Sequence, residues 1–532
     1  ALPGRGYDAS DLKHSLGQIV GNFSKFLDLQ VTGGSSSMKD GFTRMRLAGA
    51  SARETLKEAA AQQLGVARAL LETKDGVVLA PGGVTLAYSE LAVAAADVEA
   101  QEAELRPAAQ WKYIGKPVAR IDMVEKVTGT ATFGLDTRIE GMKFAAIRQN
   151  PHYGAAMRSF DASAAQNMAG VEEILDLGDA VAVVGSNTWL AQQAVEAIEV
   201  DWEPATYPKT TDAIFAEIEA AFDGSANSTM RDDGDVDSLP DGAELIEAEY
   251  RLPYLAHATM EPMNATAWYR DGGMDVWAPT QAPDLGRIAA ARHTDLSPGK
   301  INIHTTFLGG GFGRRLTQDY IEEAAAVAYQ LKVPVKLIWS REEDTRHGFL
   351  RPAMLHRMKA SLNDGELTGW HHQIVGPQVL DWYVRNAAPA QYPWAPKFLY
   401  DTLGRVGRMA EGIAAPKDIS AIEGAIEYPY QVQNVSVRHT HTDPGVPITW
   451  WRSVGYSHNG FAVETFMDEL AHESGEDPLQ FRLKMLDAEP RHREVLERAA
   501  RLADWGQPAP EGRARGLALF KSFGTYVAQV VE

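Results

Sequence analysis

Cysteine is absent from all 532 residues of the sequence. This absence excludes disulfide bonds, thiolate zinc sites, iron–sulfur clusters and a cysteine nucleophile from what this chain itself provides. A redox metal would therefore need an anchor other than a protein thiolate. Long apolar runs are also absent: the sequence has no stretch of about 18 hydrophobic residues, so no segment is predicted to span a membrane.

Positive charge is scarce relative to negative charge. The 51 Lys and Arg residues are outnumbered by 71 Asp and Glu residues, which gives a net charge of −20 at neutral pH. Such a surface repels polyanions and argues against nucleic acid or an anionic membrane face as a partner. Hydrophobic residues make up 45% of the chain, which is ordinary for a globular protein with large cores. A small-molecule substrate is compatible with this composition.

The order of helix-like and strand-like segments predicts a multi-domain α+β protein. Residues 1–105 form an N-terminal α+β region with short strands and Ala-rich helices. Residues 106–205 form an α/β domain, which ends at the break between Pro204 and Pro208. Residues 206–532 form a larger α+β region in which short strands again alternate with helices.

Local signals predict where some helices begin. Residues 30–47 are rich in glycine and serine and predict a loop, after which helical spacing of apolar residues predicts a helix over 51–64. Near the other end of the chain, Asp477 and Pro478 predict a helix start. Aspartate caps free N–H groups there, and proline suits the first helical position.

The most informative stretch is a glycine-rich loop, FLGGGFGRR, at residues 307–315. It follows an alternating strand over 300–307 and precedes a helical pattern over 318–331. Glycines let a backbone approach a ligand closely, with N–H groups available to phosphate or another anion. The alternative is a strand-to-helix turn that needs glycine only for positive φ. The candidate ligand-binding residues are Gly309, Gly310, Gly311, Phe312 and Gly313.

Common nucleotide motifs do not fit this loop. It lacks the Gly-Lys-Ser/Thr of the P-loop, and the third glycine of the dinucleotide fingerprint would fall at Arg314 or Leu316. The succession of strand, loop, helix, a strand over 333–339 and Glu342 still imitates half of a dinucleotide-binding fold. A nicotinamide or flavin dehydrogenase therefore stays as an alternative.

A second candidate site is the segment Trp450-Trp451-Arg452, in which two indoles adjoin a guanidinium. Such a group can line an aromatic-binding pocket and offer a donor fork to an oxyanion or phosphate. The alternative is a core aromatic pair with arginine at its edge. The nearby Gly455–Gly460 stretch does not have the Gly-x-Ser-x-Gly order of a serine hydrolase.

Metal sites are weaker alternatives. His439 and His441 would share one face of a strand near Asp443, although exposed strand histidines are the commoner explanation. Glu261 is either a buried carboxylate or a turn residue before proline. A calcium-loop spacing lacks the required glycine at its sixth position, so a solvated acidic loop is favoured for its four members, Asp233, Asp235, Asp237 and Glu244.

Six stretches of the sequence, in order, resemble the molybdenum-containing large subunits of the xanthine dehydrogenase/aldehyde oxidase family. Within that family they resemble the branch of isoquinoline 1-oxidoreductase beta subunits. An ordered set of motifs is more specific than any single one. The stretches are VTGGSSSMKDGFTRMRLAGASARETL, YIGKPVARIDMVEKVTGTATFGLD, HATMEPMNATA, LGGGFGRR, WWRSVG and FAVETFMDELAHESGEDPLQFRLKML.

This resemblance implies a hydroxylase that inserts oxygen from water into a C–H bond of an aldehyde or N-heteroaromatic substrate. It implies a hammerhead-type domain at 106–205 and a molybdopterin-binding region at 206–532. Molybdenum would be held by molybdopterin cytosine dinucleotide without a protein ligand, which agrees with the lack of cysteine, and electrons would leave to a small [2Fe–2S] subunit. The glycine loop and Arg452 would contact the cofactor, while the apolar residues of the substrate pocket would be Leu316, Trp450 and Trp451.

Several departures from the family pattern are expected to matter. The catalytic glutamate of a C-terminal Gly-Glu motif is not found before Val531-Glu532, so the catalytic residue is unassigned, and the region 206–532 is expected to be incomplete at its C-terminal end. A Gly-Gln-Gly element for the dinucleotide is also missing. Leu316 replaces the glutamate of the purine-specific branch, and Leu255 replaces a common glutamine.

These departures leave a cofactor-free fragment or assembly scaffold as an alternative from a different functional class. Members of this branch often carry a twin-arginine export signal, which favours the periplasm over the cytoplasm, but no such signal is found in the sequence.

Overall fold

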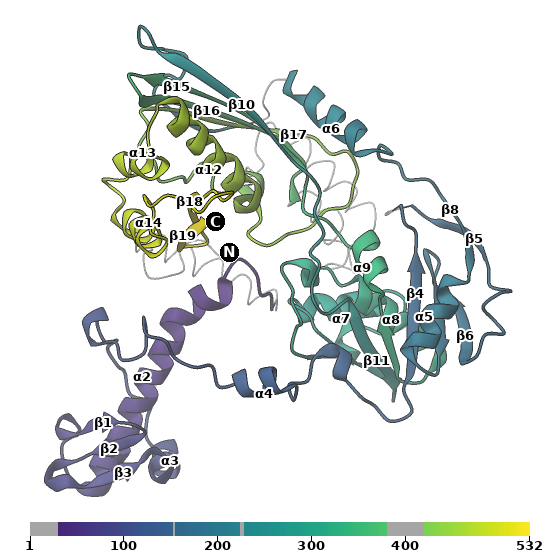
Figure 1. Cartoon of the computed structure of the whole chain (residues 1–532). Helices are drawn as coiled ribbons and strands as arrows, with labels where there is room; N and C mark the ends of the chain where they lie inside the picture. Colours follow the sequence, from purple (N-terminus) through teal and green to yellow (C-terminus); the bar gives the residue numbers. More distant parts are fainter. Residues whose placement is uncertain (1–29, 153–154, 224–227, 380–418) are drawn as a thin grey trace. The chain divides into compact units, whose positions relative to one another are not determined.

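The computed structural model describes residues 30–152, 155–223, 228–379 and 419–532 (Figure 1). The described chain forms two compact units. Unit 1 comprises Thr32–Ala131 and unit 2 comprises Thr132–Glu532, together with the short stretch at 30–31. No helix of the described ranges combines the length and the apolar character that crossing a bilayer requires.

Unit 1 is built on one long helix. The helix packs against a small antiparallel sheet of order β1-β2-β3 and against α3 through a core of Ala60, Ala61, Leu71, Val78 and Leu91. Its elements are α2 (Ser36–Leu64), β1 (Glu72–Lys74), β2 (Val77–Leu79), β3 (Thr85–Ala87), α3 (Tyr88–Ala96) and α4 (Met123–Thr128).

The predicted loop over residues 30–47 is wrong, because α2 already begins at Ser36. The chain turns at Gly34 and Ser35, both with positive φ, and the residues that follow are mostly good helix formers. The helix carries Gly41 and Gly49 in its interior, each at a cost of about 1 kcal/mol relative to alanine. It ends at Gly65, whose left-handed conformation lets its N–H donate to the carbonyl of Ala61.

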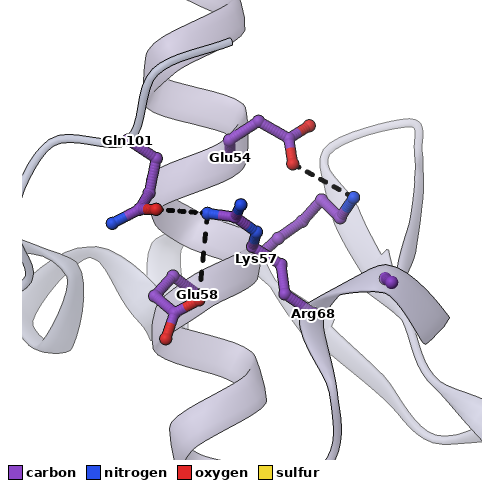
Figure 2. A pocket seen from close by; sticks show the side chains of 6 residues that line it. Glu54, Lys57, Glu58, Arg68 and Gln101 are labelled. Carbon is purple, nitrogen blue, oxygen red and sulfur yellow. Dashed lines mark hydrogen bonds and ion pairs between the residues drawn. The ribbon is translucent and has the colours of Figure 1, made fainter.

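A pocket on unit 1 is lined by charged side chains that satisfy one another (Figure 2). Lys57 lies 3.2 Å from the Glu54 carboxylate, and Arg68 donates to the Gln101 side chain and lies 3.9 Å from Glu58. Because each of these charges already has a partner, this pocket offers no unpaired group to a ligand.

Unit 2 contains a mixed seven-stranded sheet of order β13-β12-β11-β14-β4-β7-β6. Alternate residues of its strands face opposite sides: Val181 and Val183 pack towards α5, while Ala182 and Val184 belong to the core that α8 completes. The sheet is therefore covered on both faces. The elements are β4 (Lys143–Gln149), β6 (Val171–Asp176), β7 (Ala180–Gly185), α5 (Thr188–Glu196), β11 (Asn264–Arg270), β12 (Gly273–Ala278), α7 (Pro283–Ala291), β13 (Ile301–Thr305), α8 (Asp319–Leu331) and β14 (Val335–Ile338).

The predicted helix over 318–331 and the flanking strands are confirmed by α8, β13 and β14. The domain boundaries near residues 105 and 205 stay predictions. The seven-stranded sheet nevertheless joins strands from both sides of residue 205, since β14 pairs with β4.

A second sheet in unit 2 has five strands in the order β10-β15-β16-β17-β9. One face carries α12, α13 and the hairpin β18-β19 over a core that includes Trp370 and Phe466, and α6 packs on the other face. The elements are α6 (Thr211–Ala220), β9 (Ser228–Asp233), β10 (Glu244–Leu252), β15 (Met354–Asn363), β16 (Glu366–Gly376), β17 (Asn434–His441), α12 (Gly455–Glu473), α13 (Pro478–Lys484), α14 (Pro490–Leu502), β18 (Gly516–Ser522) and β19 (Thr525–Val531).

Smaller elements complete the described chain. The strands β5 (Met157–Asp161) and β8 (Glu199–Trp202) pair with each other, and α9 (Arg341–His347) follows β14. The predicted start of α13 is confirmed, because the Asp477 carboxylate accepts hydrogen bonds from the N–H groups of Leu479 and Gln480. The prediction of an α+β chain is confirmed by the two mixed sheets and their covering helices.

Candidate cofactor-binding site

The glycine-rich loop connects β13 to α8 and is pressed against its neighbours. A Cβ at Gly309 would collide with Glu261, one at Gly311 would lie 2.7 Å from the Gln281 amide oxygen, and one at Gly313 would collide with the Trp450 carbonyl. Gly313 also needs its φ of +100°. These positions require glycine because no side chain fits there.

The middle of the loop presents backbone donors. Gly310 and Phe312 have positive φ values of 101° and 55° on either side of Gly311. The N–H groups of Gly310, Gly311 and Phe312 have no hydrogen-bond partner within the described part of the chain, whereas those of Gly309 and Gly313 are taken by side-chain oxygens. Successive free N–H groups of this kind form a concave anion site.

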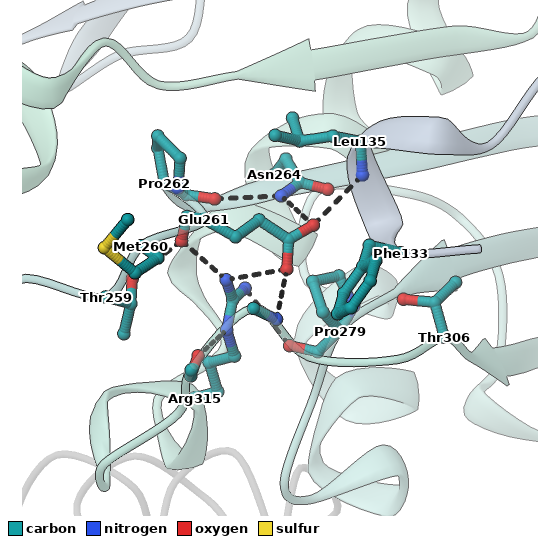
Figure 3. Close-up of polar contacts among 12 residues, drawn as sticks. Phe133, Leu135, Thr259, Met260, Glu261, Pro262, Asn264, Pro279, Thr306 and Arg315 are labelled. Carbon is teal, nitrogen blue, oxygen red and sulfur yellow. Dashed lines mark hydrogen bonds and ion pairs between the residues drawn. The ribbon is translucent and has the colours of Figure 1, made fainter. Parts of the chain in front are cut away.

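The Glu261 carboxylate holds the loop through hydrogen bonds (Figure 3). One carboxylate oxygen accepts from the N–H of Gly309 at 2.8 Å and from Arg315 at 3.3 Å. The other accepts from the N–H of Leu135 at 3.0 Å and from the Asn264 amide at 3.1 Å. With only 5% of its surface exposed, Glu261 is a buried carboxylate whose two oxygens are fully used.

Arg315 completes this network (Figure 3). Its guanidinium is fully buried and donates to the carbonyls of Gly310, Pro279 and Glu261 at 2.8, 3.2 and 2.8 Å. A buried charge with this many partners fixes its surroundings, because moving any partner would leave part of the guanidinium unpaired. The shape of the glycine loop therefore depends on the pair Glu261–Arg315.

The second candidate segment lies against the same loop. The Arg452 guanidinium lies 4.0 Å above the centre of the Phe312 ring, a cation–π distance. His257 donates from Nε2 to the Trp450 carbonyl at 2.9 Å, and the Trp451 indole donates to the Ala256 carbonyl at 3.2 Å. The stretch that ends in Glu261 thus holds both the glycine loop and the tryptophan–arginine segment.

Backbone strain follows directly after Arg452. Ser453 and Val454 have positive φ values of 68° and 49°. Positive φ is unfavourable for a β-branched residue, and such strain persists where the surrounding structure enforces it. The N–H of Val454 donates to the Trp451 carbonyl at 2.6 Å. This hydrogen bond closes the turn and so fixes the backbone from which the Arg452 side chain extends.

The predicted residues occupy the following places. Phe312 and Arg452 are exposed, while Trp450 and Trp451 are half-buried. Leu316 is half-buried and ends a short turn, Arg314–Leu316, directly after the glycine loop. The structure thus brings residues 309–313 and 450–452 together, although they are far apart in the sequence.

Comparison with known proteins relates this chain to a family. Residues 221–378 match the molybdopterin cofactor-binding domain, a range that contains the glycine loop. The beta subunit of isoquinoline 1-oxidoreductase from Brevundimonas diminuta is 27% identical over 94% of this chain and 68% of its own length. The chain belongs to the molybdopterin-binding large subunits of the xanthine dehydrogenase/aldehyde oxidoreductase family.

Two further proteins show the extent of this relationship. Nicotinate dehydrogenase of Pseudomonas putida is similar through one of its subunits, which is 27% identical over 92% of this chain and 40% of its own length. The solved aldehyde oxidoreductase of Desulfovibrio desulfuricans shares the fold with a TM-score of 0.57 and 17% identity over 81% of this chain and 53% of its own. The chain therefore spans between about two fifths and two thirds of the lengths of these proteins.

The dehydrogenase alternative is not supported for this member of the molybdopterin-binding family. In a dinucleotide-binding half, the two strands that flank the glycine loop and its helix pair with each other. Here β12 and β11 lie between β13 and β14, and β11 pairs with β14 in the antiparallel direction. The likeness to a dinucleotide-binding fold is one of sequence order alone.

The metal alternatives are not supported either. Within the described ranges, no group of three or more His, Asp or Glu side chains is arranged to hold a metal ion. His439 is buried in β17, and burial lowers its pKa to about 3. The acidic residues at 233–244 pair with local groups; for example, Asp235 accepts from the N–H of Asp237.

Sequence reasoning missed three residues that support the two candidate segments: Arg315, Gln281 and His257. Arg315 directly follows the glycine loop, so its position was a signal for a role in fixing that loop. Gln281 and His257 carry no local pattern that distinguishes them. Burial lowers the pKa of His257 to about 4, so it is a neutral hydrogen-bond donor to Trp450.

Proposed function

We propose that the glycine loop and Arg452 hold a molybdopterin cofactor, and that the intact protein oxidises an aldehyde or N-heteroaromatic substrate with oxygen from water. The observation that carries this proposal is the run of three free N–H groups at Gly310–Phe312, within the range that matches the cofactor-binding domain. Molybdopterin carries anionic and oxo groups, which fit such a concave donor surface.

The cofactor, when bound, supplies the chemistry of accepting electrons from the substrate and delivering oxygen that derives from water. The residues of this chain bind and orient it. The three N–H groups would donate hydrogen bonds to anionic groups of the cofactor, and Arg452, which lies over the Phe312 ring, would add a positive charge. Glu261 and Arg315 would keep the loop in shape through their hydrogen bonds to it.

Glu261 is not the base that takes a proton from the reacting water. Both of its oxygens already accept two hydrogen bonds each, so neither is available to a reacting group. The expectation that the catalytic glutamate belongs to a separate motif therefore stands as part of the proposal.

The proposed substrate class is supported by the residue types near the glycine loop and by the related proteins. Trp450, Trp451 and Leu316 offer apolar and aromatic surface, and Leu316 stands where a purine-specific site would carry a glutamate. Related proteins are named for isoquinoline, nicotinate and aldehydes. We infer an aldehyde or N-heteroaromatic substrate rather than a purine.

The cytosine dinucleotide form of the cofactor, a small [2Fe–2S] subunit as electron acceptor, and a hammerhead-type domain at 106–205 belong to the same proposal. They are supported by the family relationship and by the lack of cysteine, because iron–sulfur clusters would need ligands from another chain.

The test is the molybdenum and pterin-nucleotide content of the purified chain and of the variant Gly310→Ala. Alanine at this position has an unfavourable φ of +101° and brings its Cβ to 2.9 Å from the Phe312 ring. We expect about one molybdenum per wild-type chain and an about tenfold lower content in the variant. Elemental analysis and release of the nucleotide measure both.

The matched control is Gly242→Ala, which also replaces a glycine with positive φ, +84°, but has open space around it. It should retain the wild-type molybdenum content. If wild-type protein carried neither molybdenum nor nucleotide, even after reconstitution, the alternative of a cofactor-free scaffold would replace this proposal.

A further inference from the structure

Three buried histidines form a continuous hydrogen-bonded chain between the five-stranded sheet and α12. His372 Nε2 lies 2.8 Å from His356 Nδ1, and His356 Nε2 lies 3.3 Å from His458 Nδ1. The exposed fractions of His356, His372 and His458 are 0%, 0% and 2%. None of the hydrogen bonds of the glycine loop involves these three histidines, so they need a separate explanation.

All three imidazoles are neutral. Burial lowers the pKa of each well below its usual value. The charged and titratable groups that face the three histidines also lower their pKa values. Arg351 and His439 face His356 and His458, and His371 faces His372.

A neutral imidazole donates from one nitrogen and accepts at the other, so the three-histidine chain has a direction. His372 Nδ1 has no partner within the described residues. A buried acceptor without a partner is less costly than a buried N–H without one, so His372 carries its proton on Nε2. The same order then repeats along the chain, and His458 carries its proton on Nε2.

The His458 end of the three-histidine chain borders a small cavity. His458 lines a cavity of about 10 Å³ together with Arg351, Thr449, Trp451 and Val454. Thr449 is fully buried and Arg351 is 8% exposed, yet Thr449 Oγ1 and Arg351 Nε have no partner within the described part of the chain. This volume is close to what one water needs, and a buried water is stable when two to four polar groups bond to it.

We propose that this cavity is a binding site for one ordered water, which accepts from Arg351 Nε and His458 Nε2 and donates to Thr449 Oγ1. The two N–H donors match the two lone pairs of water, and the threonine hydroxyl takes one of its protons. The water would give a partner to Arg351 Nε and Thr449 Oγ1, which have none within the described residues.

The water site also positions the tryptophan–arginine segment. Trp451 and Val454 line the cavity and flank Arg452 on both sides. The proposed water would thus connect the cavity beside the strained turn at Val454, through the hydrogen bonds of His458, to the five-stranded sheet. This second step rests on the proposed function, because it concerns how firmly Arg452 is held for the cofactor.

A crystal structure of the full chain tests the water site directly. Electron density for one water within about 3.2 Å of Arg351 Nε, Thr449 Oγ1 and His458 Nε2 is expected in the wild type, and its loss is expected in Thr449→Val. An empty cavity in the wild type, or an unchanged water in Thr449→Val, would overturn the proposal.

A double-variant cycle gives a solution readout. Thr449→Val and His458→Gln should each lower Tm, and the double variant should lower it by less than the sum, because both changes disturb the same water. Thr266→Val is the matched control: it also removes a buried, unpartnered hydroxyl, but from β11, so its effect should add to that of His458→Gln. Additive effects for Thr449→Val would contradict a shared water.

The positioning step has its own measurement. The affinity for the cofactor should be about tenfold lower in Thr449→Val than in Thr266→Val. If the wild type binds the cofactor and Thr449→Val binds it equally well, positioning fails while the proposed function stands. If the wild type binds no cofactor, the proposed function fails, and the crystal and Tm measurements still decide whether the water site exists.

Discussion

At the scale of single residues, the ion pair Glu261–Arg315 makes the glycine loop possible. Replacing Glu261 by glutamine keeps its shape but removes the charge that compensates a fully buried guanidinium. Breaking one side of such a pair leaves an unpaired buried charge, so Glu261→Gln should lower the free energy of unfolding by about 3 kcal/mol and reduce the molybdenum content. Urea unfolding and elemental analysis measure the two effects.

The control for this residue is Glu247→Gln. Its carboxylate lies 3.3 Å from Lys359 but is 69% exposed, so water screens the pair and the change should stay within about 0.5 kcal/mol. An equally small loss for Glu261→Gln would mean that the loop does not depend on the charge. This contrast separates the chemistry of burial from the mere presence of a salt bridge.

At the scale of elements, the start of α13 shows how a local signal becomes a stable structure. One oxygen of Asp477 accepts from the N–H groups of Leu479 and Gln480, and the other accepts from the Trp505 indole at 2.9 Å. Asp477→Ala should therefore lower the free energy of unfolding by about 1–2 kcal/mol, measured in urea. Asp477→Asn keeps a capping oxygen and should cost much less; an equal loss from both variants would contradict a role in capping.

The same scale explains what the sequence could and could not predict. Signals confined to a few neighbours, such as the capping aspartate and the apolar spacing of α8, predict elements correctly. The prediction of a loop over residues 30–47 is wrong because it treats every glycine and serine there as a loop residue, whereas the chain turns at Gly34 and Ser35 and is helical from Ser36. The likeness to half of a dinucleotide-binding fold does not hold either, because β12 and β11 lie between β13 and β14, and strand order depends on contacts between distant segments.

The candidate site follows the same rule. The glycine loop and the tryptophan–arginine segment each carry a local pattern, so both could be found separately. Their meeting could not be predicted, because Gly313 touches Trp450 only through the fold of unit 2. His257 and Gln281 have no pattern at all and gain their roles only from burial beside these segments.

At the scale of the whole molecule, many buried neutral histidines predict sensitivity to acid. Burial lowers the pKa of His257 and His347 to about 4 and that of His439 to about 3, and the three-histidine chain is shifted in the same direction. In the unfolded chain these histidines take up protons below a pKa of about 6.5. At pH values between about 6.5 and the lowered pKa values of the folded state, only the unfolded state binds these protons. The free energy of unfolding therefore falls as the pH falls through this range.

Buried carboxyls oppose this trend. Burial raises the pKa of Glu343 to about 7 and that of Glu323 well above its usual value, so folding favours their protonated forms and gains stability as the pH falls towards about 4.5. The histidines outnumber these carboxyls, so the free energy of unfolding should fall from pH 6.5 to 4.5. Urea unfolding at several pH values measures the slope.

One histidine variant isolates the cause. Each buried histidine contributes up to about 1.4 kcal/mol per pH unit to the slope, so His439→Gln should make the pH dependence shallower by about that amount. His472→Gln, at an exposed position late in α12, is the control and should leave the slope unchanged. A pH dependence in His439→Gln as steep as that of the wild type would mean that the His439 imidazole takes up its proton in the folded state, which would contradict its lowered pKa.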